Sequence, residues 1–352
     1  MNRFIKYYVI IVSLIATRAY SQDPHFSQFY ETPLQINPAM TAVNGDMRVL
    51  ANYRDQWRSV SKPFTTYAIS VEAKMKNSKW RPKDNASFLT KAQRNIGAGL
   101  SIYRDKAGDL NMGVTKADFS LSSQVYISQF SSISLGLQGG FAQRSYNLQN
   151  ANFESQHVTG NVPNISNKYE QNSFSGDYSV GLLYKYGKND MFIASNDQVK
   201  VNFGVALQHL NAPKYSFDKN QPGKLYRKVV AHGGFIIGIK NTNVQIAPMV
   251  LFMKQGPSSE LTIGSLIKYR LKEASKYTGF NKETLFSVGG YLRAKDAIIA
   301  QVMFEKGQYA IGFSYDINIS RLTPVSKSVG GFEISLRFLT PNPFLYGSKS
   351  RI

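Results

Sequence analysis

Residues 332–338 read Phe-Glu-Ile-Ser-Leu-Arg-Phe, and this run near the end of the chain gives the clearest indication of how the protein folds. Its apolar side chains alternate with Glu, Ser and Arg, which is the period of a β-strand with one apolar and one polar face. Residues 131–146 and 199–209 repeat the alternation with small or polar residues between the apolar ones. Helical periodicity is scarce, so the sequence predicts an all-β protein.

The same alternation recurs along the chain and predicts about fourteen strands. The connections between them carry Gly, Asn and Asp, as in Asp105–Gly108 and Gly187–Asp190. The predicted strand ranges are 47–57, 64–74, 95–104, 112–126, 131–146, 177–187, 199–209, 225–239, 243–253, 259–271, 283–294, 296–305, 307–316 and 329–338.

The composition narrows the possible classes of protein. The 352 residues include 42 Lys and Arg against 22 Asp and Glu, and the resulting net charge of +20 first suggests nucleic acid or an anionic surface as a partner. Only 18% of the residues are charged, less than the roughly 25% typical of soluble domains, whereas 21 Tyr and 22 Phe are present. The absence of cysteine excludes disulfides, cysteine-ligated metals and thiol catalysis. With four His and no nucleophile motif, the sequence predicts no catalytic, cofactor or metal site.

The N-terminus has the pattern of a secretory signal peptide. A basic start at Met1–Lys6 precedes an apolar run from Tyr7 to Ala16 and the small-x-small triplet Ala19-Tyr20-Ser21. The apolar run is too short to span a bilayer, which needs about 20 residues. We therefore expect residues 1–21 to be cleaved after Ser21 and the mature chain to be exported. Nucleic acid is not an expected partner of an exported protein.

Two all-β architectures fit such strands. A soluble double sandwich would bury the apolar faces between its sheets, whereas an outer-membrane barrel would turn them toward lipid. The signal peptide, the strand length, the even strand number and the aromatic residues at strand ends favour the barrel. Those aromatic residues are Tyr126, Tyr146, Tyr184, Tyr186, Tyr226, Phe304, Tyr315 and Phe338. The prediction is a transmembrane β-barrel of about 14 antiparallel strands, formed by residues 47–340 and followed by a C-terminal tail at 341–352. We expect it to lie in the outer membrane of a Gram-negative bacterium.

Residues 22–46 precede the first strand and do not alternate. They contain several prolines and predict an extended N-terminal arm. A barrel of about fourteen strands is wider than one of eight, whose side chains fill their own interior. We therefore expect the arm to enter the lumen as a plug, held through Asp23, Phe26, Gln28, Asn37 and Pro38.

Five short motifs resemble the PorP/SprF family of type IX secretion outer-membrane proteins. They are Asp-Pro-His-Phe-Ser-Gln-Phe at 23–29, Asn-Pro-Ala at 37–39, Tyr-Arg-Asp-Gln-Trp at 53–57, Pro-Phe-Thr at 63–65 and Gln-His-Leu-Asn-Ala-Pro at 208–213. Their order and spacing make the resemblance specific, and it runs from the signal peptide to the final strand. The family usually has Tyr after Asn-Pro-Ala, where this chain has Met40.

This resemblance implies a FadL-like barrel with a non-enzymatic function. Family members support the secretion or surface attachment of cargo proteins that carry a type IX C-terminal signal, in some members gliding adhesins. The implied partners are a secreted cargo protein, periplasmic type IX secretion components and outer-membrane lipid. One alternative is a FadL-like channel or transporter for small hydrophobic solutes. Another is a lipid-modifying barrel enzyme, although no nucleophile–base set is visible.

Two places in the strands are candidate contact sites. Arg54 and Trp57, near the end of the first strand, are interpreted as a clamp on the arm, with Arg54 bonding to arm carbonyls or Asp23. The alternative is an inward Arg in a polar lumen and an interfacial Trp. His209 and Pro213 follow a strand end and predict a structural corner rather than a metal or catalytic site.

Two long connections are candidate binding loops. Counting strands from a periplasmic N-terminus puts residues 75–95 on the periplasmic side and 147–176 outside. The first is basic and is interpreted as a docking site for periplasmic partners through Lys76, Lys79, Trp80, Arg81 and Lys83. The second is rich in Asn and is interpreted as a cargo-contact loop through Asn150, Asn152, Asn161 and Asn164. The simpler alternatives are a solvated basic loop and a loose insertion.

Overall fold

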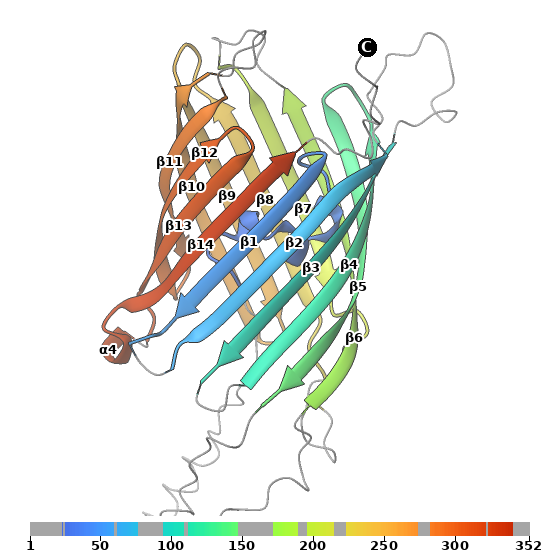
Figure 1. Ribbon diagram of the computed structural model, residues 1–352, viewed down its shortest axis with the longest axis vertical. Coiled ribbons are helices and arrows are strands. Elements are labelled where there is room, and N and C mark those ends of the chain that lie inside the picture. The colour runs from blue at the N-terminus through green and yellow to red at the C-terminus, as the bar shows by residue number, and fades with distance from the viewer. Residues whose placement is uncertain are drawn as a thin grey trace, which may run out of the picture.

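The computed structural model describes Asp23 and residues 25–59, 62–76, 94–108, 112–146, 172–188, 196–214, 223–273, 282–321 and 323–340. Within these ranges the chain forms one closed antiparallel barrel in which each strand pairs with its neighbours in sequence and β1 pairs with β14 (Figure 1). The strands are β1 (Met47–Gln56), β2 (Phe64–Lys76), β3 (Arg94–Ala107), β4 (Met112–Tyr126), β5 (Ser131–Ser145), β6 (Asn172–Lys188), β7 (Val199–Gln208), β8 (Lys228–Gly238), β9 (Val244–Gln255), β10 (Ser258–Lys272), β11 (Thr284–Arg293), β12 (Ala297–Lys306), β13 (Tyr309–Asn318) and β14 (Val329–Thr340). The predicted fold class and number of strands are confirmed.

The strand boundaries differ most from the prediction at β6. This strand begins at Asn172 rather than at residue 177, because residues 172–176 continue the pairing with β5 up to the Ser145–Asn172 pair. The predicted outer loop of residues 147–176 therefore ends before Asn172. β8 begins at Lys228, three residues later than predicted, because the Leu225 N–H bonds to the Pro213 carbonyl outside the ladder.

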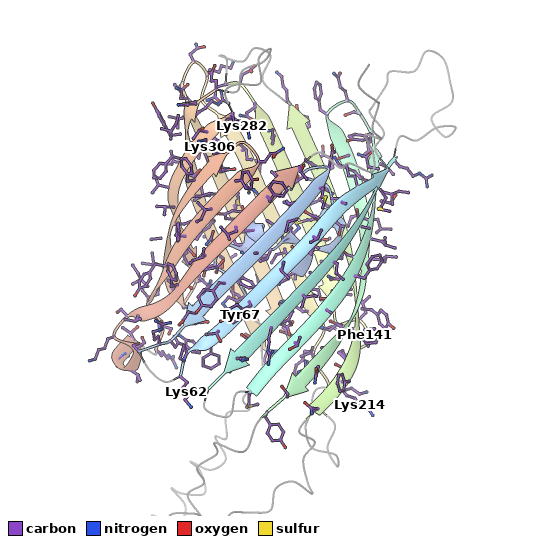
Figure 2. All side chains as sticks on the ribbon, in the orientation of Figure 1. Lys62, Tyr67, Phe141, Lys214, Lys282 and Lys306 are labelled. Carbon is purple, nitrogen blue, oxygen red and sulfur yellow. The ribbon has the colours of Figure 1, made fainter. Side chains whose placement is uncertain are left out.

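The wall of the barrel is apolar outside and polar inside. Tyr67 and Phe141 are 53% and 76% exposed on the outer face, where Figure 2 labels them. Ser120 and Gln138 point inward and are buried. This polarity is that of a barrel surrounded by lipid. Among the described residues, no helix has the length and apolar character needed to cross a bilayer.

The barrel has two rims. Odd-numbered strands begin, and even-numbered strands end, at the rim that we call the β1 rim; the opposite edge is the far rim (Figure 1). The connections β5–β6 and β7–β8 belong to the far rim, and the connection β2–β3 belongs to the β1 rim. The short helix α4 (Thr323–Ser326) lies between β13 and β14 at the far rim.

Candidate functional site: the N-terminal arm inside the barrel

Asp23 and residues 25–46 form an arm that lies inside the barrel. The prediction of an extended arm is wrong for much of it, because the chain makes three short helical turns: η1 (Phe29–Glu31), α2 (Pro33–Ile36) and η2 (Pro38–Met40). Pro33 and Pro38 stand at the first positions of α2 and η2, where a missing N–H has no cost. Figure 1 shows these turns in blue behind β1 and β2, midway along the barrel.

The arm crosses the whole lumen from the far rim to the β1 rim. At one end the Asp23 carboxylate meets His209, just after β7 ends. Midway, Asn37 contacts His232 in the middle of β8. At the other end the Ala42 N–H donates to Glu72 near the end of β2. The chain therefore enters β1 at the rim opposite to the one where Asp23 lies.

Buried charges hold the first part of the arm. The N–H groups of Ser27 and Gln28 donate to the two carboxylate oxygens of Glu333, at 2.7 and 3.0 Å. The Ser27 hydroxyl donates to Asp316 at 2.7 Å. Arg54 donates to the His25 carbonyl and to the Asp316 carboxylate. Glu333, Asp316 and Arg54 are all buried, and the low local dielectric makes these hydrogen bonds and ion pairs stronger than they would be in water.

A second buried arginine joins this cluster. Arg293 lies 3.1 Å from the Asp316 carboxylate and donates to the Ser27 hydroxyl at 2.9 Å. Arg54 and Arg293 therefore both face Asp316. Two cations around one carboxylate offset the cost of burying the neighbouring Glu333, which is 1% exposed.

Asn37 is the central polar contact of the arm. Its side-chain NH₂ group lies 3.0 Å from the Leu182 carbonyl, 3.3 Å from the Val205 carbonyl and 3.1 Å from the His232 ring nitrogen. Its side-chain oxygen accepts from the Ala39 N–H at 2.9 Å and so caps η2. One fully buried amide thus joins the arm to β6, β7 and β8.

Glycines on three neighbouring strands make room for the Asn37–Ala39 turn. A Cβ on Gly181 would lie 1.9 Å from the Asn37 side-chain oxygen, and one on Gly136 would lie 2.2 Å from the Ala39 nitrogen. A Cβ on Gly204 would lie 2.7 Å from the Asn37 amide nitrogen. A Cβ atom does not come within 3 Å of atoms to which it is not bonded, so only glycine allows the arm to approach the wall this closely.

Charged groups also fix the far-rim end of the arm. His209 lies 2.6 Å from the Asp23 carboxylate and 2.9 Å from the Asp177 carboxylate. Burial would lower the pKa of His209, but the two carboxylates and their hydrogen bonds raise it above its usual value. Burial would raise the pKa of Asp23, but the charges of His209 and Lys228 hold it well below its usual range. Asp23 and His209 therefore form a charged pair.

Apolar contacts complete the docking of the arm. Phe29 and Ile36 pack against an apolar part of the inner wall, and Phe29 meets Tyr291 edge to face with ring centroids 5.8 Å apart. Met40 packs with Ala39, Val43 and Leu183, so its side chain is part of the buried contact. The wall residues of the first cluster are Ala206, Val230, Ala247, Leu251, Met253, Leu266, Tyr291 and Ile299.

The sequence model for type IX secretion system membrane proteins PorP/SprF matches residues 18–338. The chain belongs to this family. The resemblance seen in the short motifs is therefore confirmed, and the protein is a type IX secretion system membrane protein with an outer-membrane β-barrel.

Solved structures resemble this family member only in general shape. BamA from Haemophilus ducreyi lacking POTRA domains 1–3 shares 10% identity at a TM-score of 0.42, over 84% of this chain and 70% of that one. The CymD monoaromatic hydrocarbon channel shares 10% identity at a TM-score of 0.42, over 91% and 96%. Likenesses this distant bear on neither function nor ligand. No curated protein sequence matches the chain.

The predicted arm residues come together in the lumen, with one exception. Asp23, Gln28 and Asn37 make the contacts described above, and Phe26 packs against Ala68 and Tyr103. Pro38 lies in the glycine-lined turn. Arg54 bonds an arm carbonyl, but its carboxylate partner is Asp316, because Asp23 is held by His209 instead.

Trp57 is the exception. It follows β1 at the far rim with a positive φ of 59° and packs edge to face on Phe64, with ring centroids 5.2 Å apart. Its N–H donates to the Gly330 carbonyl at the start of β14. These contacts of Trp57 thus belong to the far-rim ends of β2 and β14 rather than to the arm.

The remaining predicted residues lie at the rims. His209 turns the chain with a positive φ of 57°, and Pro213 is buried beside it. Lys76 ends β2, whereas Lys79, Trp80, Arg81 and Lys83 lie outside the described residues. The four loop asparagines, Asn150, Asn152, Asn161 and Asn164, lie outside the described residues as well, as do the predicted signal peptide and C-terminal tail.

Sequence reasoning missed the acidic partners of the arm, Glu333, Asp316 and Glu72. A signal was present: each is a carboxylate on the polar face of a strand whose other face is apolar, and such a residue must point into the lumen. The same signal marks Arg337, which contacts Glu31 of the arm and Glu305 of β12.

Proposed function

We propose that this PorP/SprF family member is a non-enzymatic adaptor of the type IX secretion system. It binds a secreted cargo protein at the far rim and supports its secretion or attachment to the cell surface, and gliding adhesins are one class of such cargo. The arm closes the lumen, so the barrel serves as a docking platform instead of a conduit. The observation that carries the proposal is the engagement of the arm with strands around the barrel, from Asp23 to Ala42.

The bonding of the arm supports closure over conduction. A solute crossing the lumen would have to displace contacts at both ends and in the middle of the arm. A buried hydrogen bond contributes about 1 kcal/mol, and one to a charged group about 1.5–3 kcal/mol. The Ser27–Gln28 contacts with Glu333 and the Asn37 contacts together set a barrier that thermal motion rarely crosses. A transporter of hydrophobic solutes would need a lumen that opens more easily.

The far rim is the proposed cargo side. With both barrel termini at the periplasmic edge, the β1 rim faces the periplasm and the far rim faces outside. The connections of residues 146–171 and 209–227 then lie outside. We assign cargo contact to the first, through Asn150, Asn152, Asn161 and Asn164. Deleting residues 150–170 should abolish surface display of the cargo while the barrel still inserts; normal display by this variant would refute the assignment.

The β1 rim is the proposed periplasmic docking side. Lys76, Lys79, Trp80, Arg81 and Lys83 form a basic segment suited to an acidic partner. Reversing the charge of Lys76, Lys79 and Lys83 should remove periplasmic type IX components from the purified complex. Unchanged co-purification would contradict this role. Reversal of Lys214, Lys224 and Lys254, which lie at the far rim, is the matched control.

The test of the function as a whole is a pull-down of the detergent-solubilised protein from its native membrane, followed by mass spectrometry. We expect a secreted protein with a type IX C-terminal domain, present in stoichiometric amount. Planar-bilayer recordings of the same preparation should show no stable open state. A stable pore without associated cargo would overturn the adaptor and favour the channel.

A further inference from the structure

The outer wall carries a groove where the barrel closes between β14 and β1. Two rows of cross-strand neighbours form it across four strands, and both rows face outward. The row nearer the β1 rim is Lys306, Tyr309, Phe338 and Val49, and the next row is Phe304, Ile311, Leu336 and Ala51. The groove measures about 440 Å³, within the range of sites that hold small ligands.

The walls of the groove are apolar except at one end. Phe304, Leu336 and Tyr309 are 40%, 50% and 61% exposed, and the small side chain of Ala51 leaves a notch beside Leu336. The Tyr309 and Phe338 rings lie with their centroids 5.0 Å apart and form the edge of the groove nearer the β1 rim. A groove of this composition, on a wall that faces the bilayer, accepts an acyl chain.

Positive charge lies at the rim end of the groove. Lys306 is exposed at the end of β12, one outward position beyond Phe304. Lys282 is exposed on the neighbouring connection, and its side chain covers Gly307, whose φ is +60°. Figure 2 labels both lysines close together at this rim. Lysines at the interface attract anionic headgroups, which lie at this depth.

We propose that this groove binds one anionic glycerophospholipid, with an acyl chain against Phe304, Ile311, Leu336 and Ala51 and the phosphate at Lys306 and Lys282. The chemistry that recognises the lipid is an apolar groove with Lys306 in its lining and Lys282 on the neighbouring connection. The site lies on the outer side of β14 and β1, the strands whose inner sides carry Glu333 and Arg54. A lipid bound there covers the outer face of the seam that closes the barrel.

The test is native mass spectrometry of the full chain released from bilayers that contain phosphatidylglycerol and phosphatidylcholine with identical acyl chains. We expect one phosphatidylglycerol to be retained in preference to phosphatidylcholine. Lys282→Gln with Lys306→Gln should weaken retention about fivefold for each lysine removed. Ala51→Trp, which fills the notch, should abolish retention of both lipids at the site.

Matched variants separate the groove from general effects. Lys62→Gln with Lys214→Gln removes the same charge at the far rim, where Figure 2 labels both residues, and should leave retention unchanged. Ala117→Trp adds the same side chain at an outward position on β4. Folding is checked by the heat-dependent gel shift of the barrel; if Ala51→Trp does not fold, the lysine pair decides. The proposal would be overturned if the Lys282→Gln, Lys306→Gln variant retained as much phosphatidylglycerol as the Lys62→Gln, Lys214→Gln control. A polypeptide bound in the groove in place of lipid would also overturn it.

Discussion

Replacing Asn37 with alanine tests how firmly the arm is held. The fully buried amide approaches two backbone carbonyls and the His232 ring, and it caps η2 through its oxygen. Its two hydrogens can make at most two good bonds at once, so the side chain contributes about three bonds in total. At about 1 kcal/mol each, Asn37→Ala should weaken docking of the arm by about 3 kcal/mol.

This loss corresponds to a change of about a hundredfold in the ratio of undocked to docked arm. In planar bilayers the wild-type protein should remain closed. The variant should open in bursts, because the undocked state becomes about a hundred times more populated. Limited proteolysis from the outside should release arm fragments from the variant at a correspondingly higher rate.

Asn44→Ala is the matched control, because Asn44 is exposed at the β1-rim end of the same arm and accepts one bond from Lys185. It should stay closed like the wild type. Asn37→Ala with wild-type conductance and wild-type resistance to protease would refute the view that this side chain holds the arm.

Three further predictions concern the same arm. Gly181→Ala should open the lumen, since its Cβ would fall 1.9 Å from the arm amide, whereas Gly187→Ala, whose Cβ meets only one atom at 3.9 Å, should not; equal conductance of the two would disprove the close approach. Arg54→Ala removes one of the cations beside the buried Asp316 carboxylate and should lower the free energy of unfolding by about 3 kcal/mol. Trp57→Ala should lose about 1 kcal/mol of ring packing and leave the lumen closed. An open lumen in Trp57→Ala would restore the interpretation of Trp57 as a clamp on the arm. Because the folded pKa of His209 lies above its usual 6.5, the stability it gives is complete below that pH and is lost as the pH rises through the raised value. Protection of the first arm residues from hydrogen exchange, taken relative to the intrinsic exchange rate at each pH, should fall over that window and should stay constant in His209→Gln, which lacks the titration; an unchanged pH dependence of protection in this variant would assign the effect elsewhere.

The strands were predictable because alternation is a local property. Glu333 lies between Phe332 and Ile334, so it shows which face of that strand is polar even when the residues on the neighbouring strands are not known. The start of β6 was missed because residues 172–176 are mostly small and polar, and their pairing with β5 is set by the partner strand rather than by their own pattern.

The path of the arm was not predictable. Its helical turns span three or four residues each, too few to show a period. Its partners are far away in sequence, such as Ser27 and Glu333, whose residue numbers differ by 306. Arg54 was predicted to bond an arm carbonyl or Asp23, and the structure has the arm carbonyl, that of His25. Sequence spacing alone could not show that the carboxylate beside Arg54 is Asp316, or that Trp57 packs on Phe64.

The most direct test of the central claim, an arm lodged in the lumen, is a disulfide across it. The chain contains no cysteine, so a Thr41→Cys, Ser120→Cys variant carries a single possible pair. The two hydroxyl oxygens lie 3.0 Å apart between the arm and β4, within reach of a disulfide. We expect this pair to oxidise fully in the assembled outer-membrane barrel and to keep it closed. Two free thiols that both react with a small maleimide in the folded barrel would contradict the account.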